Sequence, residues 1–210
     1  MPLHQLKCGE DHMRWAIWQI EETEEELWRR LIPNSESQHE YLAIHHPKKR
    51  LEWLASRLVI QSLVTQLGED YQGIYKDAFG KPHLSQLQLP ISIAHCYPIA
   101  VGAIHQNTPI GIDIERPRKQ LLKIRDRFLN DEEANFAGED LETLCKFWTG
   151  KEALYKVYGR KKLIFRKHIK VSTLKDQPDQ LLGRISYGAF KQDYNLRCCR
   201  YQGHLITYNL

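Results

Sequence analysis

Two short acidic stretches decide what this chain can form: Gly111–Glu115, which reads Gly-Ile-Asp-Ile-Glu, and Trp148–Lys156, which reads Trp-Thr-Gly-Lys-Glu-Ala-Leu-Tyr-Lys. The first stretch places Asp113 and Glu115 two positions apart in a run of β-branched residues. On a strand, this spacing points both carboxylates to one face and the isoleucines to the other. We therefore expect a strand here that carries a pair of acids on one face.

The second stretch has the spacing of a helix. Glu152 and Lys156 are four positions apart, so on a helix they share one face. Three carboxylates and one ammonium could then converge, a combination that suits a hard divalent cation and a phosphate bridged to it. Simpler interpretations stay open at this point: a strand with one wet face, and a surface Glu–Lys pair that contributes about 0.2–0.5 kcal/mol.

Composition indicates a folded domain and sets limits on its class. The 210 residues are 42% hydrophobic and include five Trp and ten Tyr, which is enough for a packed core in one large or two small domains. We expect no transmembrane helix and no signal peptide, because no apolar run reaches about 18 residues and the N-terminus lacks an apolar segment. The net charge of +4 suits an anionic ligand or an acidic partner, and equally an ordinary solvated surface.

The cysteines point to a reducing compartment. There are five, an odd number, and no two have Cys-x-x-Cys spacing. This pattern favours free thiols over a disulfide framework or a zinc site, so we expect a cytoplasmic protein.

Apolar periodicity predicts two long helices. Pro47–Leu67 is followed by Gly68 as a stop signal, and Leu141–Tyr158 has Asp140 as a possible N-cap and Gly159 at its end. Strands are predicted over residues 13–20, 91–94, 99–104, 110–115, 169–173, 184–187, 196–201 and 205–208, and short helices over residues 21–31 and from Asp131 onward. A polar turn over residues 106–109 divides the chain into halves with a similar order of elements.

Basic residues gather at three further places, each with an ordinary explanation. His95 ends the apolar run 91–94, where a hydrogen-bonded structural histidine is common. Lys48 and Lys49 open a predicted helix and could be a solvated face. The segment Arg160–Lys170 holds six Lys or Arg residues around three apolar ones, which is typical of a solvated loop or of a docking surface for an acidic protein or nucleic acid.

Five motifs in order resemble the 4′-phosphopantetheinyl transferase superfamily. They are the two acidic stretches together with Arg50–Arg57, Gly80–Pro82 and Ile91–His95, and they span residues 48 to 160. The length and the gap between the acidic stretches are similar to the Sfp type, a monomer of two lobes. The resemblance thus implies an α+β fold of two similar lobes related by pseudo-two-fold symmetry, residues 1–107 and 108–210, each a small antiparallel sheet packed on a long helix.

That family moves the 4′-phosphopantetheine arm of coenzyme A onto a serine of a carrier protein and releases adenosine 3′,5′-bisphosphate. The resemblance implies that Asp113, Glu115 and Glu152 hold Mg²⁺, or Mn²⁺, against the coenzyme A pyrophosphate. Lys156 would contact the transferring phosphate. Glu152 and a metal-bound water are both candidates for the base that takes the serine proton.

The other implied contacts are basic side chains. The predicted coenzyme A residues are Arg57 and His95 at the 3′-phosphate, Lys48 or Lys49 beside them, and Lys81 at the nucleotide pocket. Ala94 departs from the family, which often has Ser there, so one hydroxyl donor is missing. Lys161 and Lys162 are predicted to dock an acidic acyl or peptidyl carrier protein; we expect neither a nucleic acid nor a membrane as partner.

Two rival functions follow from the same residues. A metal-dependent nuclease also combines acids with a lysine, but there the lysine commonly lies two residues after an acid on a strand, whereas here it lies four residues after Glu152 on a predicted helix. A non-catalytic coenzyme A-binding protein on the same fold is supported only by Ala94. The sequence does not select a carrier protein or a pathway.

Overall fold

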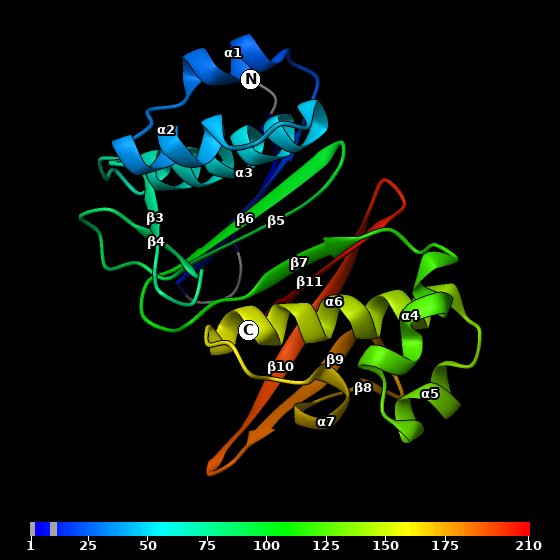
Figure 1. Ribbon diagram of the computed structural model, residues 1–210. Coiled ribbons are helices and arrows are strands. Elements are labelled where there is room, and N and C mark those ends of the chain that lie inside the picture. The colour runs from blue at the N-terminus through cyan, green and yellow to red at the C-terminus, as the bar shows by residue number, and fades with distance from the viewer. Residues whose placement is uncertain (1–2, 9–11) are drawn as a thin grey trace. The chain divides into compact units, whose positions relative to one another are not determined.

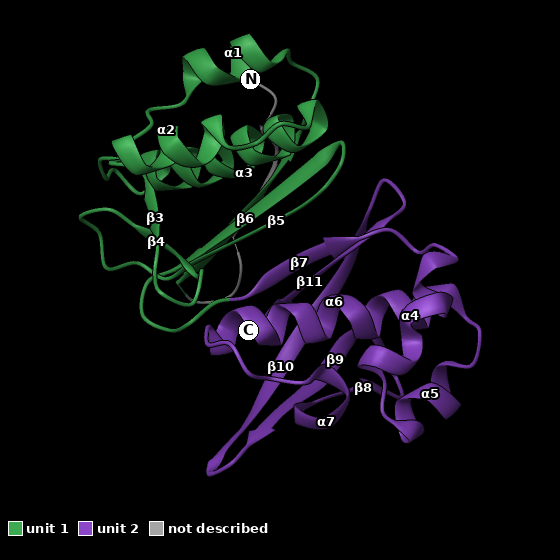
Figure 2. Cartoon of the chain, in the orientation of Figure 1, with its two compact units in different colours: residues 1–110 green, residues 111–210 purple. Residues whose placement is uncertain are grey.

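The computed structural model describes residues 3–8 and 12–210, the first of these ranges as backbone only, and has a mixed α+β fold with antiparallel sheets (Figure 1). This confirms the fold class predicted from the sequence. The chain divides into two compact units, residues 1–110 and 111–210 (Figure 2). The pseudo-two-fold relation between them stays a prediction, and each unit is described by itself.

Unit 1 is an antiparallel sheet covered by one long helix, α3, Pro47–Gln66. The four strands have the order β1-β2-β6-β5. Their bounds are β1 Leu3–Cys8, β2 Met13–Gln19, β5 Ile91–Cys96 and β6 Ile99–His105. Two short helices and a small hairpin complete the unit: α1 Glu24–Arg30, α2 Ser35–Leu42, β3 Ile74–Lys76 and β4 Pro82–Leu84.

The close packing of α3 on the sheet depends on one glycine. A Cβ on Gly102 of β6 would lie 2.5 Å from Val59 Cγ1 of α3, far inside a normal contact. The absence of a side chain at Gly102 therefore lets the helix approach the strand. Apolar residues at helical spacing on α3, among them Leu54, Leu58 and Leu63, are buried in this layer.

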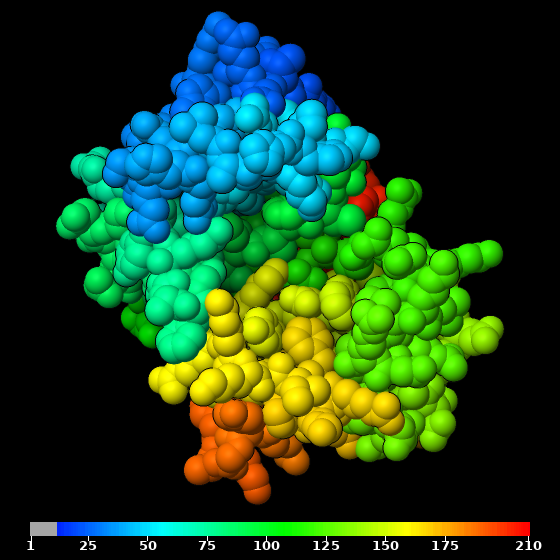
Figure 3. Space-filling model, viewed as in Figure 1, coloured from blue at the N-terminus to red at the C-terminus, as the bar shows by residue number. Residues whose placement is uncertain are grey.

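Unit 2 is a five-stranded antiparallel sheet with the order β7-β11-β10-β9-β8. The strands are β7 Ile112–Glu115, β8 Ile169–Leu174, β9 Gln177–Tyr187, β10 Phe190–Tyr201 and β11 His204–Asn209. Helix α6, Leu141–Tyr158, packs on the sheet, with α4 Gln120–Phe128, α5 Asp131–Ala137 and α7 Phe165–His168 beside it. The turn between β9 and β10, orange in Figure 3, projects from the unit.

The caps of α6 fix its two ends. The Asp140 side chain accepts a hydrogen bond of 2.8 Å from the Thr143 N–H, and Gly159 follows in the left-handed conformation, with φ of 66°. Both bounds are those predicted from the sequence. Since α6 carries the second acidic stretch, these caps set where that stretch lies along the sheet.

Several elements differ from the sequence-based expectation. Helices α2 and α4 were not predicted, and neither was α7, which lies inside the basic segment Arg160–Lys170. Strands β9 and β10 are much longer than the predicted 184–187 and 196–201. Their added residues are mostly exposed and polar, so they pair through the backbone without the apolar alternation on which the prediction relied. No described helix is long and apolar enough to cross a bilayer.

Candidate functional site

The candidate site lies in unit 2, where β7 meets α6. The two elements approach closely because Gly111 precedes the strand: a Cβ there would lie only 2.0 Å from the Ala153 carbonyl oxygen and 2.9 Å from Val157 Cγ2. Any side chain at Gly111 would push the strand away from the helix. The glycine of the first stretch thus brings the acids of β7 to the helix that carries the second.

Lys156 joins the two stretches directly. Its Nζ donates to Asp113 Oδ1 at 2.7 Å and to the Ile112 carbonyl oxygen at 2.9 Å. Lys156 therefore pairs with an acid on a strand 43 positions away, and the surface Glu–Lys pair within the helix is not the interaction found. Ile112 and Ile114 are buried in the core, as the alternation of β7 predicted.

The carboxylates of this site influence one another. Burial raises the pKa of Asp113, against the attraction of Lys156, and the charge of Glu115 raises it further. Burial also raises the pKa of Glu152 to about 7, again with contributions from the charges of Asp113 and Glu115. Raised values mean that the charge of Lys156 does not offset the burial of these carboxylates and the repulsion between them. Such values are typical of functional sites.

The donors suit a hard divalent cation in type and in charge. Asp113, Glu115 and Glu152 offer carboxylate oxygens, and their unbalanced charge would be relieved by a cation. Within the described residues, no three Asp, Glu, His or Cys side chains already form a metal-binding group. Lys156 holds one oxygen of Asp113, and Glu115 pairs with Arg118 at 2.9 Å. The metal-ligand role of the three acids therefore stays a prediction.

Sequence reasoning missed a buried ion pair between Lys151, the residue before Glu152, and Glu133. Lys151 is fully buried, and its Nζ donates to Glu133 Oε2 at 2.6 Å, to the Phe128 carbonyl oxygen at 2.8 Å and to the Ile169 carbonyl oxygen at 2.7 Å. The acceptors belong to α5, to the end of α4 and to the start of β8. One ammonium therefore ties the middle of α6 to three neighbouring elements.

The sequence did contain a signal for this pair. Phe147, Lys151 and Leu154 follow one another at helical spacing on the buried face of α6. A lysine among apolar residues of a buried stripe requires an anionic partner or several acceptors. Glu133 meets that need, and its other carboxylate oxygen accepts from the Val171 N–H at 2.8 Å.

In unit 1, the predicted coenzyme A residues lie in different surroundings. Lys48 and Lys49 open α3, and the Lys48 Nζ lies 5.2 Å from the centre of the Tyr97 ring. His95, near the end of β5, is 36% exposed and faces Glu52 of α3, with its Nδ1 3.4 Å from Glu52 Oε2. Since Lys49 contacts the same oxygen at 2.7 Å, unit 1 brings His95 and Lys49 together.

Arg57 is more enclosed than its predicted role suggests. Its side chain is 3% exposed, stacks 3.6 Å from the centre of the Trp53 ring, and pairs with Glu40 at 2.7 Å. Burial lowers the pKa of Arg57 to about 10, against the attraction of Glu40. Its phosphate contact stays a prediction. Lys81 lines a separate pocket of unit 1 with His83 and Tyr75, whose rings stack 5.4 Å apart.

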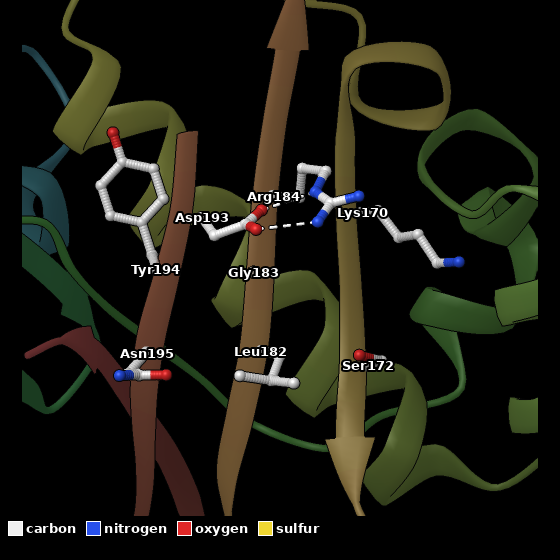
Figure 4. Close-up of a pocket in the computed structure, with 8 residues that line it drawn as sticks. All are labelled: Lys170, Ser172, Leu182, Gly183, Arg184, Asp193, Tyr194 and Asn195. Carbon is white, nitrogen blue, oxygen red and sulfur yellow. Dashed lines mark hydrogen bonds and ion pairs between the residues drawn. The ribbon is translucent and has the colours of Figure 1, made fainter. Parts of the chain in front are cut away.

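A further pocket lies on strands β8, β9 and β10 of unit 2, away from the predicted residues. Figure 4 shows its lining, in which Arg184 donates two hydrogen bonds to Asp193, of 2.5 and 2.8 Å. Lys170 at its edge pairs with Glu132 at 2.6 Å. Because its cations already have anionic partners, this pocket does not add to the candidate site.

Comparison with known proteins agrees with the site in unit 2. Residues 109–208 match the family model described as the 4′-phosphopantetheinyl transferase superfamily, and this range contains both acidic stretches. No curated protein matches the chain. The family expected from the sequence is thereby confirmed, whereas the two-lobed Sfp type stays a prediction. Over residues 109–208, nearly the whole of its C-terminal unit, the chain is therefore similar to the 4′-phosphopantetheinyl transferase superfamily.

Proposed function

We propose that this protein transfers the 4′-phosphopantetheine arm of coenzyme A to a serine of an acidic acyl or peptidyl carrier protein. The observation that carries the proposal is the contact between Lys156 and Asp113, which joins the two acidic stretches beside Glu152. The match of residues 109–208 to a transferase superfamily supports the same chemistry. The protein is proposed to act as a cytoplasmic monomer, without nucleic acid or membrane.

The reaction forms one bond to phosphorus and breaks another. The serine oxygen attacks the pyrophosphate phosphorus next to pantetheine, the bond from that phosphorus to the bridging oxygen breaks, and adenosine 3′,5′-bisphosphate leaves with the bond electrons. Glu152 is the proposed acceptor of the serine proton, because it is a carboxylate close to both Asp113 and Lys156. Lys156 would stabilise the charge that grows on the phosphate during the attack.

Asp113, Glu115 and Glu152 are the proposed ligands of Mg²⁺, with Mn²⁺ as an alternative ion. When bound, the ion would neutralise the pyrophosphate and orient it for attack. Asp113 would keep its contact with Lys156 through one oxygen and offer the other. His95, Arg57, Lys48, Lys49 and Lys81 are the residues proposed to bind the nucleotide part of coenzyme A.

Removal of metal gives the first test of these ligands. The pKa of Glu152 is 4.5 in the unfolded chain and about 7 in the folded protein. Its contribution to stability is therefore fully present below pH 4.5, where Glu152 is protonated, and is lost as pH rises through about 7. In EDTA, the melting temperature of Glu152→Gln minus that of the wild type should therefore be larger at pH 8 than at pH 4. Adding Mg²⁺ at pH 8 should raise the melting temperature of the wild type only.

Differential scanning fluorimetry measures both effects. Asp176→Asn, an exposed acid of the same unit, is the matched control and should respond like the wild type. Equal Mg²⁺ responses in the wild type and in Glu152→Gln would remove Glu152 from the proposed ligands.

The carrier protein is proposed to dock on the basic segment Arg160–Lys170. Arg166 and Lys170 in it are paired with Asp131 and Glu132, whereas Lys161 and Lys162 are exposed and form no ion pair with any residue that the structure describes. Ile164 beside them is 50% exposed. Free positive charge around an apolar residue suits an acidic protein surface.

Charge reversal tests this docking surface. The double variant Lys161→Glu, Lys162→Glu should raise the KM for the carrier protein about tenfold at low salt and leave kcat and the KM for coenzyme A near the wild-type values. Added salt should reduce the difference, because it screens the wild-type attraction. Lys175→Glu with Lys191→Glu makes the same change in net charge elsewhere in unit 2. Equal carrier KM values for the two double variants would refute docking on this segment.

A further inference from the structure

Glu52 is a buried carboxylate of unit 1 that faces two of the proposed phosphate-binding side chains. Its side chain is only 7% exposed, and its Oε2 lies 2.7 Å from Lys49 Nζ and 3.4 Å from His95 Nδ1. The other oxygen, Oε1, accepts a hydrogen bond of 3.1 Å from the Tyr97 N–H. One carboxylate of α3 thus contacts the helix entry, the end of β5 and the turn that follows it.

The Glu52 carboxylate is ionised in the folded protein, although its burial opposes ionisation. Burial raises its pKa, but the close contacts with His95 and Lys49 lower it, with a net pKa of about 2. A buried charge is costly unless it is paired. The contacts of Glu52 with His95 and Lys49 therefore hold all three side chains in a defined arrangement.

The arrangement directs His95 and Lys49 outward. Because Nδ1 of His95 faces Glu52, its Nε2 lies on the opposite side of the ring, and the ring is 36% exposed. The Lys49 side chain is 60% exposed, although its ammonium contacts the same carboxylate oxygen. Lys48 lies over the Tyr97 ring, so Tyr97 connects a third cation to the turn that Glu52 holds.

We infer that Glu52 is a positioning residue of the phosphate site, which holds His95 and Lys49 in the geometry that binds the 3′-phosphate of coenzyme A. The inference rests on the proposed function, since it takes coenzyme A as the ligand. Glu52 does not contact the ligand in this role. It orients the His95 ring so that Nε2 can donate to a phosphate oxygen, and it keeps His95 and Lys49 close together.

Coulomb attraction alone and a positioning role predict opposite effects of replacing Glu52, so the direction of the change in phosphate binding tests the inference. Glu52→Gln removes a negative charge near an anion site, and Coulomb attraction by itself would then tighten phosphate binding. If Glu52 positions the donors, the same change loosens them and phosphate binding weakens. A purely structural role would weaken the binding of coenzyme A and of its dephosphorylated form alike.

Binding is therefore compared for coenzyme A and 3′-dephospho-coenzyme A by isothermal titration calorimetry, without any carrier protein. The wild type should prefer coenzyme A. Glu52→Gln should weaken coenzyme A binding about tenfold and leave dephospho-coenzyme A binding within about twofold of the wild type. Glu22→Gln is the matched control, because Glu22 is an equally enclosed carboxylate of unit 1, 8% exposed and paired with Arg30, and it should keep the wild-type preference.

A measurement on the wild type covers the case in which Glu52→Gln does not fold. Long-range ¹H–¹⁵N spectra of the His95 ring should show a proton on Nδ1, which donates toward Glu52. A His95 ring with Nδ1 unprotonated and Nε2 protonated would overturn the inference.

Other outcomes separate the inference from the proposed function. A wild type that prefers coenzyme A, together with a Glu52→Gln variant that keeps or increases this preference, would overturn the role of Glu52 alone. A wild type that binds both ligands equally would remove the 3′-phosphate site and the inference with it. A wild type that binds neither would contradict the proposed function itself.

Discussion

Replacing Asp113 with Asn is expected to lower the rate of phosphopantetheine transfer at least about 100-fold, the usual cost of removing a group that stabilises charge at a reacting phosphate or carbonyl. Asp113 is the acid that contacts Lys156, and its charge also contributes to the raised pKa of Glu152. One substitution therefore disturbs the proposed metal ligands, the phosphate-binding lysine and the proposed base together. Transfer is measured with saturating coenzyme A and an apo carrier protein.

The fold should survive this change. Asparagine has nearly the same shape as aspartate, and its amide oxygen can still accept from Lys156. Circular dichroism and the melting temperature should stay close to those of the wild type, and Asp176→Asn should be fully active. A folded Asp113→Asn variant with more than about a tenth of the wild-type rate would contradict the proposed site.

The second large effect concerns stability. Lys151→Met should lower the free energy of unfolding by about 3–5 kcal/mol, the usual cost of removing one partner of a buried ion pair. The change leaves the Glu133 carboxylate without its cation and removes the hydrogen bonds that Lys151 donates to the carbonyl oxygens of Phe128, Phe165 and Ile169. Urea denaturation at neutral pH, followed by circular dichroism, measures this loss.

The matched control is an exposed pair of the same length. Lys170 and Glu132 also lie 2.6 Å apart, but their side chains are 46% and 74% exposed. Exposed pairs contribute about 0–1 kcal/mol, so Lys170→Met should cost no more than that. If Lys151→Met and Lys170→Met cost the same, the buried pair is not what ties α6 to its neighbours.

Much of the fold could be predicted because each main element has a local signal in the sequence, such as apolar spacing, a helix cap or strand alternation. The apolar spacing and the Gly68 stop predicted α3, and the Asp140 cap and Gly159 predicted the bounds of α6. The alternation of Ile112 and Ile114 predicted β7. In these elements, local propensity and tertiary burial agree, which is the condition under which sequence reasoning works.

The elements that were missed have no such agreement. Helix α2 has an exposed Leu42 and buried Ser37 and Tyr41, so it gives no clear apolar stripe. Helix α4 does have an apolar stripe, Leu121, Ile124 and Phe128, but no side chain caps its N-terminus to mark where it begins. Elements of this kind are held by the surfaces on which they pack, and those surfaces come from distant parts of the chain.

The site was predictable in type but not in its contacts. The spacing of Asp113 and Glu115 predicted acids on one face of a strand, but the partner of Lys156 could be found only once β7 lay against α6. Glu52 escaped notice because its burial depends on His95, which belongs to a strand far away in sequence, as well as on Lys49 of its own helix. Such pairings depend on tertiary structure, and periodicity does not encode them.

The central claim is tested most directly by incubating the wild-type protein with coenzyme A, Mg²⁺ and an acidic apo carrier protein and weighing the carrier by mass spectrometry. The proposal predicts that the carrier gains one phosphopantetheine arm on a serine, that adenosine 3′,5′-bisphosphate appears in equal amount, and that EDTA or Asp113→Asn prevents both. Unmodified acyl and peptidyl carrier proteins, in the presence of a wild type that binds coenzyme A, would contradict transferase activity and leave a coenzyme A-binding protein.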